Sequence, residues 1–148
     1  MPQTICTIGF AQKSLKTFVQ LLKDAGVTKL VDTRLNNTSQ LAGFSKKNDL
    51  AYILELVGIK YEHEPKMAPT DDILKKYKKK QITWSEYEKA YLGLLEERQI
   101  LNLVSQQISN ETICLLCSED KPHHCHRRLL AEFIKQNTMT EIVIQHLV

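Results

Sequence analysis

Short apolar runs alternate with helical patterns along the first half of the chain. Residues 4–9 and 27–32 are β-branched, apolar runs typical of buried strands. Ser14 is placed to cap a helix between them, and apolar residues then recur at helical spacing at Leu15, Phe18, Val19, Leu22 and Ala25. Gly26 stands where a helix commonly ends in a left-handed residue. The pattern predicts a strand, a helix and a second strand.

The same order follows once more. Asn48 or Asp49 is placed to start a helix that Gly58 ends, and residues 59–63 form a third strand-like run. The two helix exits, residues 22–27 and 54–59, are alike in their pattern of residues. Strands that alternate with helices predict a parallel sheet joined by right-handed crossovers.

The middle of the chain is helical and strongly charged. We expect one helix from Thr70 or Asp71 to Lys80, a second that begins at Thr83 with a capping box to Glu86, and a third over residues 100–108. Residues 112–117 are the most apolar run and predict a central strand, followed by a helix over 125–136 and a strand over 141–146. The sequence thus predicts one α/β domain spanning 1–148. It has a mostly parallel five-stranded sheet, helices on both faces, and a helical insertion between strands three and four.

Composition narrows the class of protein. The chain has 148 residues, 43% hydrophobic and 25% charged, with a formal net charge of +3, as in a soluble globular protein. No run approaches the roughly 20 apolar residues of a membrane span, and the N-terminus lacks the features of a signal peptide. We therefore expect no membrane partner, a cytoplasmic location and four reduced cysteines. The five glycines are too widely spaced for a glycine-rich phosphate loop, which removes the usual support for a nucleotide-binding enzyme.

Reactive side chains follow the predicted strands. Ligands of open parallel sheets bind beyond the carboxyl ends of the strands. Strand two delivers Asp32 and Arg34 there, strand three His63, and strand four Cys117 and Glu119. A thiol, carboxylates, a histidine and an arginine at one edge indicate a functional site.

The segment from Cys117 to Arg127 carries the sharpest signal. Cys125 lies near the start of the predicted last helix, where the helix dipole favours a thiolate. Arg127 and His126 would add positive charge in the same place. The alternative is a buried strand cysteine followed by a solvated, histidine-rich loop. Cys6 and Cys114 lie inside predicted strands and are expected to act as packing residues only.

We expect an enzyme site for a small anionic or nucleotide-like ligand. The candidate catalytic residues are Cys125, Cys117, Glu119 and Asp32, and the candidate ligand-binding residues are Arg34, Arg127, His126 and His63. Cys125 or Cys117 would supply the thiol, and the two arginines would hold the anion. Asp32 and Glu119 would orient the arginines or transfer protons. An ion pair of Arg34 with Asp32 or Glu119 is an equal alternative to its ligand role.

Two other classes of function stay open. Cys117 and Cys125, with one of His123, His124 or His126, have the chemistry of zinc ligands, but closely spaced ligand pairs are lacking. We therefore expect no metal and no cofactor. A binding module for nucleic acid or protein is the alternative to an enzyme, because lysines cluster in residues 75–80 beside Trp84, Tyr87 and Tyr91. Core packing of these aromatic residues and a solvated lysine surface are the favoured interpretation, and the pattern does not predict the oligomeric state.

The order of the motifs resembles the DUF488 family, a domain of unknown function. The resemblance rests on Thr7-Ile8-Gly9, Asp32-Thr33-Arg34, Gly58-Ile59 with Tyr61 and His63, Leu115 to Glu119, and Cys125-His126-Arg127. It implies a single α/β domain with these polar residues gathered at one site, and it implies no particular reaction. The family usually has a histidine and a small residue after Thr-Ile-Gly, where this chain has Phe10-Ala11. If that histidine is catalytic in the relatives, the departure implies an altered or inactive member of the family.

Overall fold

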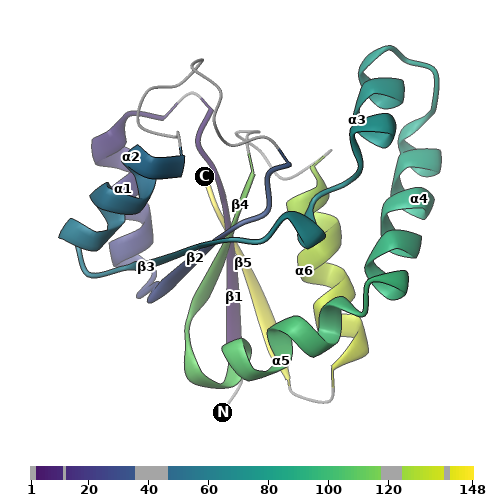
Figure 1. The fold of residues 1–148 in the computed structure, drawn as a ribbon. Helices are drawn as coiled ribbons and strands as arrows, with labels where there is room; N and C mark the ends of the chain where they lie inside the picture. Colours follow the sequence, from purple (N-terminus) through teal and green to yellow (C-terminus); the bar gives the residue numbers. More distant parts are fainter. Residues whose placement is uncertain (1–2, 12, 36–46, 118–124, 139–140) are drawn as a thin grey trace.

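The computed structural model describes residues 3–11, 13–35, 47–117, 125–138 and 141–148. Its sheet has five parallel strands in the order β3-β2-β4-β1-β5 (Figure 1). The strands are β1 (Gln3–Gly9), β2 (Lys29–Asp32), β3 (Lys60–His63), β4 (Ile113–Cys117) and β5 (Ile142–Leu147). The helices are α1 (Leu15–Asp24), α2 (Lys47–Leu56), the short 3-10 helix η2 (Pro65–Met67), α3 (Asp71–Lys78), α4 (Trp84–Glu97), α5 (Ile100–Asn110) and α6 (His126–Asn137). The predicted α/β class, central β4 and helical insertion between β3 and β4 are confirmed.

Local signals in the sequence set the helix boundaries. Ser14 and Thr70 accept hydrogen bonds from backbone N–H groups at the starts of α1 and α3, and Thr83 forms the predicted capping box with Glu86. Gly26 and Gly58 have φ angles of +70° and +78°, which L-residues with a Cβ rarely adopt. Strand β2 begins at Lys29, later than predicted, because the Val27 N–H bonds to the carbonyl of Leu22 and extends the helix exit. The Ile59 N–H bonds in the same way to Leu54, and β3 begins at Lys60.

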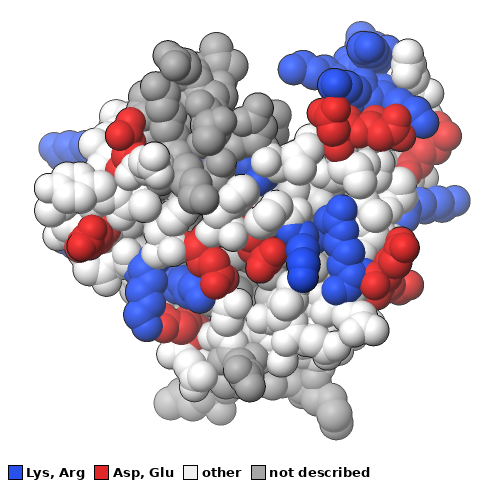
Figure 2. All heavy atoms as spheres, in the orientation of Figure 1, with Lys and Arg blue, Asp and Glu red and all other residues white. Residues whose placement is uncertain are grey.

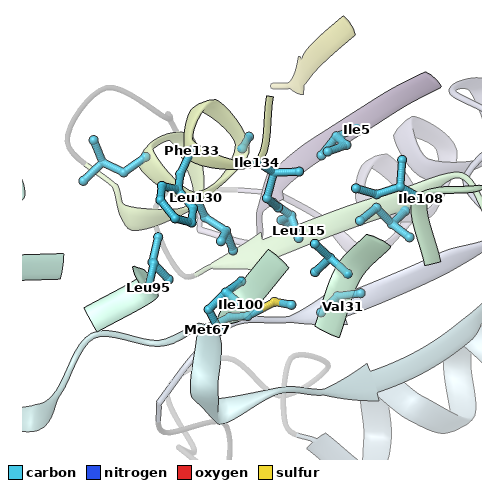
Figure 3. Close-up of a cluster of buried hydrophobic side chains, with 14 of the residues drawn as sticks. Ile5, Val31, Met67, Leu95, Ile100, Ile108, Leu115, Leu130, Phe133 and Ile134 are labelled. Atoms are coloured by element: carbon cyan, nitrogen blue, oxygen red, sulfur yellow. The ribbon is translucent and has the colours of Figure 1, made fainter. Parts of the chain in front are cut away.

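Helices cover both faces of the sheet, as predicted. On one face, α1 and α2 pack on the strands through Phe18, Leu22, Leu50, Leu54, Leu30, Ile8 and Leu116. On the other face, α6, α5 and α4 pack on Ile5, Val31 and Leu115. Figure 3 shows this cluster, with Leu130, Phe133 and Ile134 of α6, Ile5 and Leu115 of the strands, and Met67 and Ile100 below them. The sheet is therefore the middle of three layers.

The helical insertion is held by aromatic packing. The rings of Trp84 and Tyr87 stack with centroids 4.8 Å apart, and Tyr77 contacts both rings. Tyr87 and Tyr91 are buried against α6, which confirms that this stripe is core packing. The Tyr91 hydroxyl donates to the Met67 carbonyl at 2.6 Å and so ties α4 to η2. Figure 1 shows α3 reaching past the carboxyl edge of the sheet on the side of α6.

The lysine cluster lies on the exposed surface of α3. Lys75 pairs with Asp71 at 2.8 Å and Lys76 with Asp72 at 3.2 Å. Figure 2 shows blue and red atoms next to each other at this end of the molecule. The surface is therefore a mixture of both charges. None of the described helices combines the length and apolar character that crossing a membrane requires.

Candidate functional site

The carboxyl edge of the sheet brings the ends of β2, β3 and β4 side by side. Asp32 is the register partner of His63 on β3 and of Leu116 on β4. Successive side chains of a strand point to opposite faces, so neighbouring residues diverge at this edge. Asp32 lies on the face of α1 and α2, whereas Cys117, two positions beyond Leu115, lies on the face of α6. The structure thus places the candidate residues in two adjacent groups.

The first group is built around the Asp32 carboxylate, which is fully buried. Arg34 donates to it from Nε at 2.8 Å, from a terminal nitrogen at 2.7 Å and from its backbone N–H at 3.1 Å. Tyr61 donates its hydroxyl to the same carboxylate at 2.6 Å. The ion pair of Arg34 with Asp32, one of the two predicted alternatives, is present in the structure.

These contacts fix the charge of Asp32. Burial alone would raise its pKa, but the hydrogen bonds and positive charge of Arg34, with the Tyr61 hydroxyl, outweigh burial and hold the pKa below the usual 3.8. The guanidinium of Arg34 lies over the Phe10 ring, with 5.1 Å from its central carbon to the ring centroid. Phe10 therefore packs against Arg34 at the position where the family resemblance implies a histidine.

His63 joins this group through the backbone. Its Nε2 lies 2.8 Å from the carbonyl oxygen of Arg34, so His63 supports the turn that carries the arginine. The structure thus brings together Asp32, Arg34 and His63, three of the candidates, on the α1 and α2 side of the edge.

Thr33 connects the first group to α6. Its hydroxyl donates to the Leu116 carbonyl at 2.7 Å, so the same oxygen accepts from His126 Nε2 at 3.0 Å. His126 Nε2 also lies 2.9 Å from the Thr33 carbonyl, which requires a proton on this nitrogen. Sequence reasoning quoted Thr33 only within a motif and missed this role. The signal was a hydroxyl residue between two charged residues at a strand end.

His126 does not add the positive charge that we predicted. It is buried between Thr33 and Tyr91, whose ring meets it edge-on at 5.6 Å. Burial, aided by the neighbouring charge of Arg127, lowers the pKa of His126 to about 4 despite the hydrogen bond to Thr33. The imidazole is therefore neutral near pH 7, and Arg127 supplies the positive charge.

The second group consists of Cys117, Cys125 and Arg127. Cys117 ends β4, Cys125 is the N-cap residue of α6, and Arg127 lies in the first turn of that helix. Cys117 is 1% exposed, Cys125 3% and Arg127 0%. A terminal nitrogen of Arg127 donates to the Cys117 sulfur at 3.4 Å. A fully buried guanidinium thus lies against a sulfur atom at the end of the central strand.

The two sulfur atoms of this group are bonded to each other. Cys117 and Cys125 form a disulfide, with their Cα atoms 7.5 Å apart. This corrects our expectation of four reduced cysteines. The physical reason is that the first turn of α6 packs beside the end of β4, which brings both buried sulfurs to one place. Cys6 and Cys114 stay unbonded, as expected of packing residues.

A further polar pair lies on the same face as Arg127. Thr7 of β1 hydrogen-bonds through its hydroxyl to His146 Nδ1 on its register partner strand β5. Burial, aided by the positive charge of Arg127, lowers the pKa of His146. Sequence reasoning quoted Thr7 in a motif and did not single out His146, because the proximity of β5 to β1 depends on strand order.

Several candidates fall outside the described residues. They are Glu119, His123 and His124. Within the part of the chain that is described, no three histidine, cysteine, aspartate or glutamate side chains gather closely enough to hold a metal ion.

The family of the chain follows from comparison with known proteins. A search of curated proteins and a search of solved structures gave no match. A family model described as domain of unknown function DUF488 matches residues 14–134, which include both groups of site residues from Asp32 to Arg127. Since the match covers most of the chain, this protein belongs to the DUF488 family.

Proposed function

We propose that the carboxyl edge of the sheet is the active site of an enzyme that acts on a small anionic ligand through a thiol of Cys117 or Cys125. The observation that carries this proposal is the 3.4 Å contact of the buried Arg127 guanidinium with the Cys117 sulfur. A positive charge beside a sulfur in a buried setting favours the thiolate once the disulfide is reduced. A thiolate is the form of cysteine that acts as a nucleophile.

The start of α6 adds a second favourable field. Cys125 occupies the N-cap position of this helix of 12 residues, whose N-terminus carries a partial positive charge. The planar fork of Arg127, in the first turn of the helix, suits the oxygens of a phosphate or carboxylate. In this proposal Arg127 holds the anion beside the thiol, and Glu119 stays a predicted proton donor or acceptor.

The sequence left two roles open for Asp32, orienting the arginines or transferring protons. We assign it the orienting role. Its pKa lies below the usual range, so the carboxyl is ionised at neutral pH and has no proton to give. Arg34 is bound to it at two nitrogen atoms. We propose that the pair fixes the chain that leads from β2 over the edge of the sheet, and that Arg34 contributes charge to the site from this fixed position.

The binding-module alternative has less support. Lys75 and Lys76 are paired with aspartates of their own helix, which weakens any positive field over α3. Nucleic-acid binding stays an untested prediction, and a salt-dependent binding assay starting at about 50 mM salt tests it.

Alkylation of the reduced chain over a range of pH tests the proposal. Iodoacetamide rates are followed peptide by peptide, and the midpoint of each rate profile is compared with the free-thiol value of about 8.5. We expect Cys117 or Cys125 to give a midpoint below that value. Midpoints at or above it for both thiols would overturn the proposal.

The same digest supplies internal controls. Burial raises the pKa of Cys6 to about 11, and burial also raises the pKa of Cys114 well above its usual value, so both should react only at high pH. Arg127→Gln should move the midpoint of the reactive thiol upward. Arg128→Gln is the matched variant, because it removes a neighbouring charge that pairs with Glu132 on its own helix. Far-UV circular dichroism shows whether each variant is folded.

A further inference from the structure

We propose that Cys117 and Cys125 form a two-cysteine redox couple that reduces a small hydroperoxide, with a small thiol as the reductant that regenerates it. This inference rests on the proposed function, because it uses the same Arg127-stabilised thiolate. It differs from the proposed function in its substrate, a neutral hydroperoxide in place of an anion, and it gives the two cysteines different roles.

The pairing of the sulfurs is selective. Cys6 and Cys114 are direct register partners on β1 and β4, yet they remain unbonded thiols. The bond joins instead Cys117 and Cys125, where the end of a strand meets the start of a helix. Closing it requires no partner protein, since both sulfurs already lie together. Of the four cysteines, this is the pair that the fold joins.

Burial of the pair excludes a protein as the oxidant, so the oxidant and the reductant are both small molecules. Both sulfurs lie almost entirely below the surface, so a protein disulfide would not reach them. A hydroperoxide is scarcely larger than water and carries the oxygen–oxygen bond that a thiolate attacks. The Arg127 guanidinium donates at the Cys117 sulfur and would also face negative charge that develops on the departing oxygen. Cys117 is therefore the attacking thiolate, and Cys125 resolves it.

The reaction balances in two oxidative steps and one reductive step. The Cys117 thiolate attacks one peroxide oxygen, an S–O bond forms, the O–O bond breaks, and the departing alkoxide or hydroxide takes a proton from water. The Cys125 thiolate then attacks the Cys117 sulfur, so that the S–S bond forms, the S–O bond breaks and hydroxide leaves to become water. Two small thiols reduce the disulfide by exchange and are themselves joined as a disulfide.

Peroxide treatment of the reduced full chain tests the couple. One equivalent of hydrogen peroxide should remove two of the four free thiols and leave a Cys117–Cys125 cross-link in the peptide map. With excess dithiothreitol, the chain should consume peroxide faster than dithiothreitol alone. Cys125→Ser should stop turnover and leave a sulfenic acid on Cys117 that dimedone traps. Cys117→Ser should neither turn over peroxide nor form a sulfenic acid, and Cys6→Ser should behave as the natural chain.

Three results would overturn the inference. They are loss of thiols no faster than in free N-acetylcysteine, cross-linking of Cys6 with Cys114 in place of the proposed pair, and dimedone labelling confined to Cys125 in Cys117→Ser. The pH profile of alkylation distinguishes failure of the redox couple from failure of the proposed function. A lowered midpoint without peroxide reactivity contradicts the redox couple alone, whereas ordinary midpoints at both thiols contradict the activated thiol itself.

Discussion

A single buried carboxylate, that of Asp32, ties the end of β2 to the chain that follows it. Arg34 donates three hydrogen bonds to its two oxygens, and Tyr61 donates one more. Both side chains of this ion pair are buried, with Arg34 5% exposed and Asp32 0%. Removal of one partner would leave a charge buried without compensation, which costs more than the loss of an exposed pair.

We predict that Asp32→Asn lowers the free energy of unfolding by about 3–5 kcal/mol at pH 7, as for other broken buried pairs. Urea unfolding followed by circular dichroism measures the change. Asp71→Asn is the matched control, because it breaks an exposed Asp–Lys pair on α3 and should change stability very little. The low folded pKa of Asp32 means that its stabilisation is complete above the unfolded value and is lost as pH falls through the folded value. Equal effects of the two variants would contradict this account of Asp32.

His126 predicts a second, separate dependence on pH. Its pKa falls from 6.5 to about 4 on folding, so between these values the unfolded chain binds a proton that the folded chain does not. The unfolding free energy should therefore fall as pH drops from 6.5 to about 4, with His126 contributing about 3 kcal/mol to that fall. Unfolding curves at several pH values measure it. His126→Gln should flatten this part of the profile, and an unchanged slope in His126→Gln would show that the buried imidazole is not its source.

Among the elements, helix ends were the most predictable from the sequence. Caps at Ser14, Thr70 and Thr83 and glycines after α1 and α2 are local features, and each needs only a few neighbouring residues to act. The strand starts were less predictable. The first residues after each glycine still bond back to the helix, a contact that the apolar pattern does not reveal.

Glycine substitutions should separate backbone conformation from packing. Gly26→Ala and Gly58→Ala should each destabilise the chain by about 1–2 kcal/mol, because both residues have positive φ, although an added Cβ would meet no atom within 4 Å. Gly93→Ala, in the middle of α4 with equally open space, should stabilise it by about 0.5–1 kcal/mol. Thermal unfolding of the three variants measures these signs. A loss of stability in Gly93→Ala of the same size would show that space, not backbone angle, decides the outcome.

For the molecule as a whole, the sequence predicted the location of the site better than its internal arrangement. Alternation of strands and helices is enough to place Asp32, His63 and Cys117 at one edge. The alternation does not tell which face of the sheet each residue occupies. Cys117 and Arg127 lie on the face of α6, whereas Asp32 and Arg34 lie on the opposite face. The neutral state of His126 was also beyond the sequence, because it depends on burial beneath Tyr91 of the insertion.

The two groups of site residues are nevertheless connected through Thr33. Thr33 bonds to Leu116 and His126 and is followed directly by Arg34, so the packing of α6 and the position of the arginine are linked. We propose that a small anion binds in this region, beside the thiol pair and Arg127.

Protection of the thiols by inorganic phosphate tests whether an anion binds there. Alkylation of Cys117 and Cys125 in the reduced chain is measured with and without phosphate, at one pH and with ionic strength matched by sodium chloride. We predict that phosphate slows alkylation of these two thiols in the natural chain and in Arg128→Gln, but not in folded Arg127→Gln. Alkylation rates that phosphate leaves unchanged in the natural chain would contradict the claim.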